Sequence, residues 1–439
     1  MKLLNVRRIS LFVLFLSFLI LGFQKSYAYD HSLLEYYGAD HTESEVTIKG
    51  TVLMEQATEP TKIQADPLIR MQMRYMLGLM RSRETKAAAL YPKWSFSLTE
   101  IKKLAVGFYA VKYDLKTKGV FASGTTQYTF TIPLNPKKIF AQSKGQCMQE
   151  TAVESNFWYH WEPLLGNCPL KENVEYFNYT TDLKLIANTA ESYPLYDKLV
   201  DSNKIIKMTL FFGFEKYGFQ NWSPEGGEDW GIRGYNQQRE FLKSMGFSET
   251  IWTRQQIETL YKAKDRFIPY ISEYNLAGST ANIRIRLVLA DTGFAYNSTA
   301  FHMLLKDALA KESVVAYNGH SGIGHNLDLA AIEKLRTIKF TFNPNYQILF
   351  LGSCVPYAYY TEMFFSRKKS AKDVNGSLKL DILSYGKESV FANQEDHALT
   401  RALVSYAETG SKQSYQNIIR SSPNYFFGVN GDEDNPTSK

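Results

Sequence analysis

Apolar positions in the first half of the chain follow a pattern that predicts a β-rich domain. The stretches Leu104–Leu115 and Gln127–Ile132 are rich in aromatic and β-branched residues. Turn-forming residues at Lys116–Gly119 and at Ser123 and Gly124 separate them, as in a sandwich. The segment Asp66–Arg81 has the period of an amphipathic helix that packs on these strands. We therefore predict a β-rich N-terminal domain over residues 29–200.

The second half alternates apolar, β-branched runs with stretches of helical period. The predicted strands are Ile205–Phe214, Thr250–Trp252, Ile283–Ala290, Val314–Asn318 and Ile348–Leu351, and the predicted helices are Gly234–Met245, Gln255–Tyr274, Thr299–Lys311 and Leu327–Ile338. Alternation of this kind predicts an α/β domain over residues 201–439, with a mostly parallel sheet flanked by helices. Reactive groups in such sheets lie just past the carboxyl ends of the strands.

The N-terminus has the organisation of a cleavable signal peptide over residues 1–28. Three basic residues precede the apolar run Ile9–Leu21, and Ser26–Ala28 supplies small residues at a cleavage site. The alternative is a membrane anchor, but the run is shorter than the ~20 residues that span a bilayer. No later segment is long and apolar enough to act as one. We therefore expect an exported protein, periplasmic or secreted, with no transmembrane segment after signal removal.

The charge of the chain argues against nucleic acid or anionic membrane as a partner. The formal net charge is +6, and the predicted signal peptide holds four basic residues and no acid. The exported chain is therefore close to neutral, at about +2.

Three cysteines are an odd number for an oxidising compartment. Cys147 and Cys168 are close in sequence, and a disulfide between them would close a loop of ~20 residues and stabilise the fold by about 3 kcal/mol. Cys354 is left over. Such a thiol is a buried inert residue, an intermolecular crosslink or a nucleophile.

An aromatic run, Asn156–Glu162, lies between the first two cysteines. It has two interpretations: a stacking platform for sugar rings, or a strand that packs aromatic side chains on both faces. We favour the strand, because such runs more often belong to a core.

Two apolar strands each end in a residue able to carry chemistry. Val314–Asn318 leads into Gly319 and His320, and the strand that ends near Gly352 leads into Cys354. With one crossover helix between them, both side chains are expected at the same edge of one sheet. Neighbouring strands lie ~5 Å apart, so imidazole and thiol would face each other in an arrangement suited to acyl transfer.

In these two blocks the sequence resembles the caspase-like cysteine peptidases, which include caspases, legumain, gingipains and clostripain. Their signature is an apolar block ending in His-Gly and a second ending in the nucleophilic Cys. The resemblance covers roughly residues 204–407. It implies a caspase-like fold and an endopeptidase that acts on peptide or protein substrates without a cofactor. Cys354 would be the nucleophile and His320 its acid–base partner, with an oxyanion hole formed by the N–H groups of Cys354 and of Ser321 or Gly322.

Two departures from the family pattern affect the site. Ser321 follows His320 where the family has Gly, with Gly322 one place later. Gly352 stands two residues before Cys354, where clostripain-like enzymes carry an acid that selects basic substrates. Asp291, at the end of a preceding strand, is a candidate for the S1 pocket, although acids that cap such loops are commoner.

Three other interpretations of the same residues remain open. Ser321 lies in a Gly-x-Ser-x motif like a serine-hydrolase elbow, but Ile323 replaces the last Gly. His320 and His325 are spaced i, i+5 without a nearby carboxylate, which is a poor template for zinc, and we expect no metal. The chain as a whole is alternatively an inactive caspase-like scaffold or binding protein of the cell envelope. Finally, Ser366–Lys372 is either a processed linker or an exposed basic loop.

Overall fold

The computed structural model describes residues 36–83, 86–148, 152–186, 191–215, 229–262, 268–294, 298–387, 389, 395–420 and 426–437. Residues Leu34–Lys439 form one compact unit. The predicted signal peptide lies outside the described residues. Within the described ranges, no helix combines the length and apolar character needed to cross a membrane.

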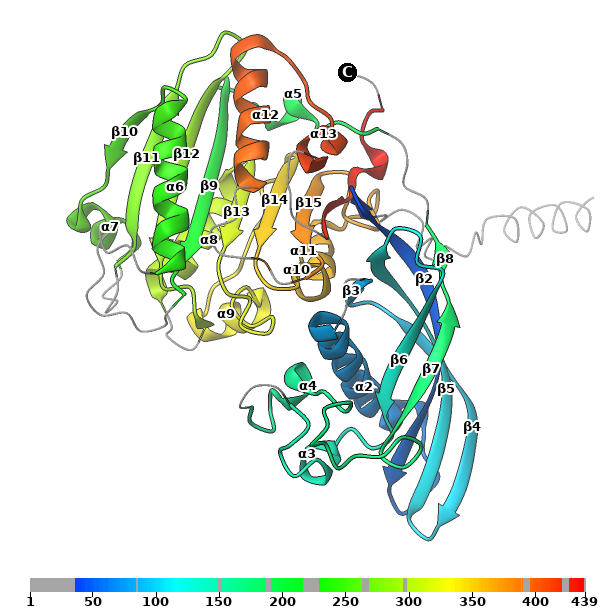
Figure 1. Cartoon of the computed structure of the whole chain (residues 1–439). Coiled ribbons are helices and arrows are strands. Elements are labelled where there is room, and N and C mark those ends of the chain that lie inside the picture. Colours follow the sequence, from blue (N-terminus) through cyan, green and yellow to red (C-terminus); the bar gives the residue numbers. More distant parts are fainter. Residues whose placement is uncertain are drawn as a thin grey trace, which may run out of the picture. The chain divides into compact units, whose positions relative to one another are not determined.

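The second half of the chain folds around a mostly parallel sheet, which confirms the predicted α/β class (Figure 1). Its strands are β9 (Ile205–Gly213), β10 (Ser248–Ile251), β11 (Tyr270–Leu276), β12 (Asn282–Ala290), β13 (Val314–Asn318), β14 (Gln347–Gly352), β15 (Leu380–Tyr385) and β16 (Phe427–Asn430). Their spatial order is β10-β11-β12-β9-β13-β14-β15-β16. The five strands from β12 to β15 are parallel, and β10, β11 and β16 pair antiparallel with their neighbours.

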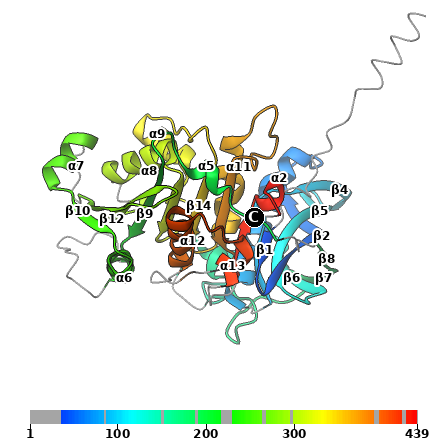
Figure 2. The same cartoon turned by 90° about the horizontal axis from the view of Figure 1, so that it is seen from above.

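Helices cover both faces of this sheet (Figure 2). They are α5 (Tyr196–Leu199), α6 (Trp230–Ser244), α7 (Arg254–Tyr261), α8 (Thr299–Lys311), α9 (Leu329–Arg336), α10 (Pro356–Tyr359), α11 (Thr361–Lys368), α12 (Glu395–Thr409) and α13 (Tyr415–Arg420), with a 3₁₀ turn at Asp432–Asp434. One core packs α6, α12 and α13 against one face, and a second packs α7, α8, α9 and α11 against the other. Burial on both faces explains why β13 and β14 consist entirely of buried residues.

Most strands of the first half continue the same sheet, while β6 (Gln127–Pro133) and β7 (Tyr176–Asp182) form a separate two-stranded sheet. Its elements are β1 (Tyr36–Gly38), β2 (His41–Glu55), α2 (Lys62–Arg83), β3 (Ala87–Leu90), β4 (Ser95–Ala105), β5 (Phe108–Ala122), β6 (Gln127–Pro133), α3 (Ile139–Gln142), α4 (Phe157–His160), β7 (Tyr176–Asp182) and β8 (Lys184–Leu185). Strand β1 pairs with both β16 and β2, and β2 pairs with β5 over their full length. Helix α2 and the β6–β7 pair share a core with β2 and β5. The domain boundary at residue 200 stays a prediction.

Three predicted elements differ in the structure. The turn expected at Lys116–Gly119 is strand, because these residues pair with Ser44–Thr47 in the middle of β2. The helix expected over Gln255–Tyr274 ends at Tyr261, and from Tyr270 the chain forms β11 against β12. Strand β12 provides backbone hydrogen-bond partners for β11, and the helical periodicity of the sequence does not predict this pairing.

The third difference is the aromatic run, whose residues Phe157–His160 form one turn of helix and not a strand. This turn packs directly on α2. A Cβ atom at Gly78 would lie 2.2 Å from the carbonyl oxygen of Trp158, so only glycine permits the contact. Tertiary packing, and not a strand partner, therefore sets the conformation of the run.

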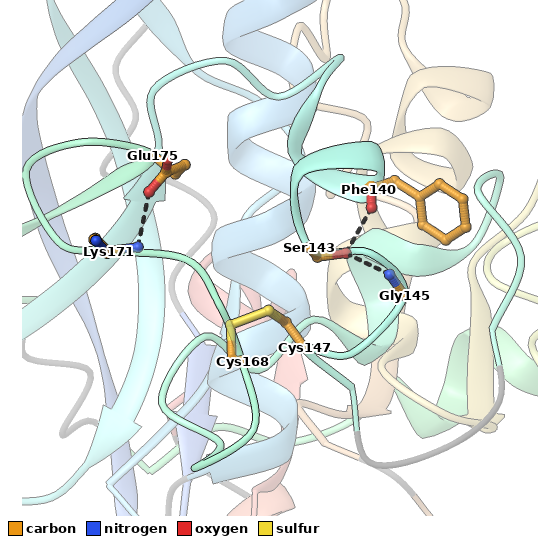
Figure 3. Close-up of a disulfide and its surroundings, with 7 residues drawn as sticks. All are labelled: Phe140, Ser143, Gly145, Cys147, Cys168, Lys171 and Glu175. Atoms are coloured by element: carbon orange, nitrogen blue, oxygen red, sulfur yellow. Dashed lines mark hydrogen bonds between the residues drawn. A yellow bond between two sulfur atoms is a disulfide. The ribbon is translucent and has the colours of Figure 1, made fainter.

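Cys147 and Cys168 are joined by a disulfide across a sequence separation of 21 (Figure 3). Around it, Ser143 donates a hydrogen bond to the carbonyl of Phe140, and the Glu175 carboxylate accepts one from the Lys171 N–H. Both cysteines pack in a cluster with Phe157 and Trp158 of α4. The disulfide thus fixes the irregular segment that carries α4.

A buried ion pair joins the first half to the helix that follows Cys354. Glu43 of β2 is fully buried and lies 3.3 Å from the ammonium group of Lys118 of β5. Its second oxygen accepts a hydrogen bond from the hydroxyl of Tyr357, three residues after Cys354. Burial raises the pKa of Glu43, while Lys118 and Tyr357 act in the opposite direction. Both partners therefore favour the charged form of this carboxylate against the larger effect of burial.

We expect Lys118→Met to destabilise the protein by about 3–5 kcal/mol at neutral pH, because it leaves an uncompensated buried charge. Because the pKa of Glu43 in the folded protein is raised above its ordinary value of 4.5, the loss should shrink as the pH falls toward that raised pKa and should be small once both folded proteins hold Glu43 protonated. Urea unfolding at several pH values measures both effects. As control, Lys112→Met removes an exposed pair with Glu100 and should cost no more than about 1 kcal/mol. Equal losses for both variants would contradict the role of the buried pair.

Replacing both Cys147 and Cys168 by Ser should lower the free energy of unfolding by about 3 kcal/mol, because the unfolded chain regains the entropy of the closed loop. Denaturant titration without reductant measures the loss. The free energy of unfolding of wild type treated with reductant should fall toward that of the double variant. A double variant as stable as the oxidised wild type would show that the disulfide does not contribute the expected stability.

Candidate active site

The parallel register of β13 and β14 places His320 and Cys354 at the same edge of the sheet. Asn318, the last residue of β13, pairs with Gly352, the last residue of β14. Each candidate follows its strand by two residues. The N–H of Gly319 extends the pairing by donating to the carbonyl of Gly352 at 3.3 Å. Because α9 makes the crossover between them, the two segments leave adjacent strands in the same direction.

His320 is held at both its ring and its backbone. Its Nε2 atom lies 2.7 Å from the backbone carbonyl oxygen of Glu215, just beyond β9. A carbonyl oxygen only accepts, so this contact assigns the proton of a neutral ring to Nε2 and leaves Nδ1 as the basic nitrogen. The carbonyl of His320 accepts hydrogen bonds from the Tyr317 hydroxyl at 2.7 Å and from Asn326 Nδ2 at 2.9 Å. Ring orientation and tautomer are thus set by the protein.

Cys354 keeps its thiol and is partly buried. It lies in a strand–turn–helix connection between β14 and α10, and the next residue, Val355, has a left-handed backbone with φ of 53°. Helix α10 is a single turn, and its first residue is Pro356, which has no backbone N–H. A helix this short adds little to stabilisation of a thiolate.

Backbone strain is concentrated beside both candidates. Gly322, Ile323 and Gly324 are three successive residues with positive φ, of 57°, 56° and 88°. For β-branched residues such as Ile323 and Val355 this conformation costs about 1–3 kcal/mol and persists only where surrounding contacts enforce it. One such residue follows His320 by three positions and the other directly follows Cys354.

Contacts from several elements enforce these two turns. The Tyr360 hydroxyl donates to the carbonyl of Ser321 at 2.7 Å, which ties the segment after Cys354 to the segment after His320. Ile323 packs in the cluster around the disulfide, and Val355 packs with β3 and β5 of the first half. Both turns are therefore shaped in part by the N-terminal half of the chain.

A polar contact beneath the strand ends accounts for Gly352. Asn318 Nδ2 donates to the buried carboxylate of Asp396, at the start of α12, at 3.1 Å. A Cβ atom at Gly352 would lie 2.0 Å from Asn318 Oδ1. The position two residues before Cys354 therefore has no room for the acid that clostripain-like enzymes carry, unless Asn318 moves.

The remaining predicted residues lie at different distances from this edge. Ser321 is 4% exposed, and its carbonyl accepts the N–H groups of Gly324 and Asn326, so it is a buried part of the turn. Asp291 is 2% exposed, and its carboxylate accepts the N–H of Gly293. Strand β9 separates the strand before Asp291 from β13. This placement favours the capping role for Asp291 over a role in the S1 pocket.

The other interpretations gain no support from the geometry. No helix follows Ser321 until Leu329, unlike a nucleophile elbow. His325 is exposed, and no group of three or more His, Cys, Asp or Glu side chains in the described ranges is arranged to hold a metal ion.

The basic segment Ser366–Lys372 begins in helix α11 and ends in an exposed turn at Ser370–Lys372. Its first residues end helix α11, where Arg367 pairs with Glu333 at 2.9 Å. Lys368 donates to backbone carbonyls, and burial lowers its pKa to about 7. The exposed residues Ser370–Lys372 agree with the exposed basic loop, and the processed linker stays a prediction.

A cavity of about 510 Å³ is lined in part by residues that follow His320 and Cys354 in the sequence. Its walls are helix α2, the segments around β3 and α4, the turn after His320 and the end of α10. Leu77, Tyr91, Ala358 and Tyr359 line it, and Cys354 packs in the same apolar cluster as these four residues. The size is within the usual range of ligand sites. Sequence reasoning missed this site because its walls come from segments more than 200 residues apart.

Comparison with protein-family models, with curated proteins and with solved structures finds no match to this chain. What the site does is therefore argued from its own geometry.

We expect Gly352→Ala to disturb the site by displacing Asn318 from Asp396. The overlap should cost about 1–3 kcal/mol of stability and lower the reactivity of Cys354 toward a thiol-directed reagent in the folded protein, because the strand end must shift. Thermal unfolding and alkylation rates measure these effects. Gly166→Ala is the matched control, since no atom lies within 4 Å of its added Cβ, and it should change neither. A Gly352→Ala protein with wild-type stability and alkylation rate would refute the steric argument.

Proposed function

We propose that this chain is an exported cysteine endopeptidase of caspase-like type that hydrolyses peptide bonds through Cys354 and His320. The observation that carries the proposal is the register of β13 and β14, which brings a His and a non-disulfide Cys to the same position past two adjacent parallel strands. The left-handed residues beside both positions add support, because strain of this kind collects at functional sites.

In this mechanism the sulfur of Cys354, as thiolate, attacks the carbonyl carbon of the scissile bond. The C–N bond then breaks, the imidazolium of His320 donates its proton to the departing amine, and a thioester remains on the enzyme. A water molecule next gives a proton to the imidazole and attacks the thioester, which releases the acid product and regenerates the thiol pair. Backbone N–H groups of Cys354 and of Ser321 or Gly322 are the expected donors to the oxyanion.

The carbonyl of Glu215 has a specific part in this scheme. By accepting from Nε2–H in the neutral ring, it leaves Nδ1 to exchange a proton with the sulfur or the leaving amine. A neutral carbonyl orients the ring without the strong charge stabilisation that a carboxylate would give to imidazolium. The pair then works as a dyad, with no acidic third member required.

The second candidate function is an inactive scaffold or binding protein of the cell envelope. The cavity beside Cys354 favours this alternative, because its size and aromatic lining suit ligand binding with or without turnover. The two functions differ in whether Cys354 reacts.

Labelling with peptidyl acyloxymethyl ketones that differ in the P1 residue tests the proposal. We expect one thioether adduct per wild-type chain, located at Cys354 by peptide mass mapping. Cys354→Ala should abolish labelling and peptide turnover with little loss of stability. His320→Ala should reduce turnover by about 10²–10⁴-fold, since a positioned proton donor is lost.

Ser321→Ala is the matched control, because its proposed contribution is a backbone N–H that alanine retains. The rate of peptide turnover by Ser321→Ala should remain within a few-fold of the wild-type rate. If Ser321→Ala abolishes turnover and Cys354→Ala does not, Ser321 is the nucleophile instead. If wild type neither reacts with any electrophile nor turns over any peptide, the scaffold function is correct.

A further inference from the structure

The cavity beside Cys354 combines aromatic surfaces with a cationic rim. Trp94, after β3, and Trp158, on α4, both line it. Arg70 and Arg74 lie one turn apart on α2 and line the same wall, and both side chains are exposed. The guanidinium carbon of Arg70 is 5.0 Å from the ring centre of Trp94, and that of Arg74 is 6.0 Å from the ring centre of Trp158.

The two arginines differ in their partners. Arg70 pairs with Asp66, one turn earlier on the same helix, at 2.6 Å. Arg74 has no carboxylate within ion-pair distance in the part of the chain that the structure describes. Asp328, which also lines the cavity, caps helix α9 by accepting the N–H of Ala331. Of the two arginines, Arg74 is thus the one without a carboxylate partner among the described residues, and its charge is available to a ligand.

The walls of the cavity are fixed before any ligand arrives. The glycine contact between Gly78 and Trp158 and the disulfide at Cys147 hold α4 against α2. The Tyr91 hydroxyl donates to Glu362 of α11 at 3.0 Å, which holds the β3 segment against the element that follows Cys354. Such preorganisation reduces the entropy lost on binding.

We propose that this cavity is a substrate subsite that binds an acidic side chain, together with a neighbouring aromatic or apolar side chain, of the peptide held at Cys354. Arg74 supplies the charge for the carboxylate, and the indole rings of Trp94 and Trp158 supply the apolar surface. The inference rests on the proposed function and adds a preferred substrate class to it: peptides with an acidic residue beside an aromatic one, a few positions from the bond that is cut.

The position of the cavity supports this assignment. Its lining residues follow His320 by three to eight positions and Cys354 by four and five positions, so they border the place where a scissile bond would lie. Extended peptide advances ~3.3 Å per residue, so a side chain only a few residues from that bond would reach the cavity. Position 352, two residues before Cys354, is Gly and not an acid that would select a basic substrate residue. Substrate preference is therefore left to contacts farther from Cys354.

Equilibrium binding to the full-length Cys354→Ala protein tests the subsite without relying on turnover. Three peptides identical except for one residue, with Phe-Glu, Phe-Gln or Phe-Lys at their centre, are titrated by calorimetry. We expect the Phe-Glu peptide to bind about tenfold more tightly than the Phe-Lys peptide, as for a hydrogen bond to a charged group. Arg74→Glu in the same background should reverse the order. Arg254→Glu, at an exposed position on α7 outside the cavity, should leave it unchanged.

The outcomes for the subsite and for the peptidase are distinguishable. Binding that follows the charge at position 74, in a protein whose wild type cleaves nothing, supports the subsite and overturns the proposed function. Turnover by wild type with equal kcat/KM for the three peptides, unaffected by Arg74→Glu, supports the peptidase and overturns the subsite. The subsite is also overturned if none of the three peptides binds.

Discussion

The buried carboxylate of Glu43 is the interaction on which the arrangement around Cys354 depends most. It accepts from Tyr357, a residue of the single helical turn after Cys354, and it is balanced by Lys118 from the neighbouring strand. An ionised carboxylate in a protein interior is tolerated only where its partners are fixed. Once β2 and β5 are paired, the position of Tyr357 is therefore fixed too, and with it the turn that presents the thiol.

This dependence explains why the two halves of the chain share one sheet. Strand β1 pairs with β16 on one side and β2 on the other, which continues the mostly parallel sheet into the long β2–β5 pair. The backbone hydrogen bonds of this path hold the first half in register with the second. Glu43 then accepts a hydrogen bond from Tyr357, while residues of β3 and α2 pack with the end of α10. The first half thus acts as a structural part of the candidate site.

Much of the second half was predictable from its sequence, because burial on both faces produces apolar runs that local periodicity separates well. The bounds predicted for α8 and β13 agree with the structure, and those for β9, β12 and β14 differ by no more than a residue or two. Strand β11 was missed, because its existence depends on the edge of β12, and the helical turn at Phe157–His160 was mistaken for a strand. Both depend on tertiary partners that pattern alone does not contain.

The candidate site, too, was predictable only in part. The juxtaposition of His320 and Cys354 followed from two strands and one crossover, which are local features of the sequence. The groups that orient these two residues could not be predicted from local features. The carbonyl of Glu215 is a backbone group 105 residues from His320, and Glu43 lies 314 residues from Tyr357. A motif therefore identifies the candidate residues but not the groups that hold them in place. Since left-handed Ile323 and Val355 persist only where their surroundings enforce that conformation, and those surroundings include the first half, the geometry of the pair is a property of the whole compact unit.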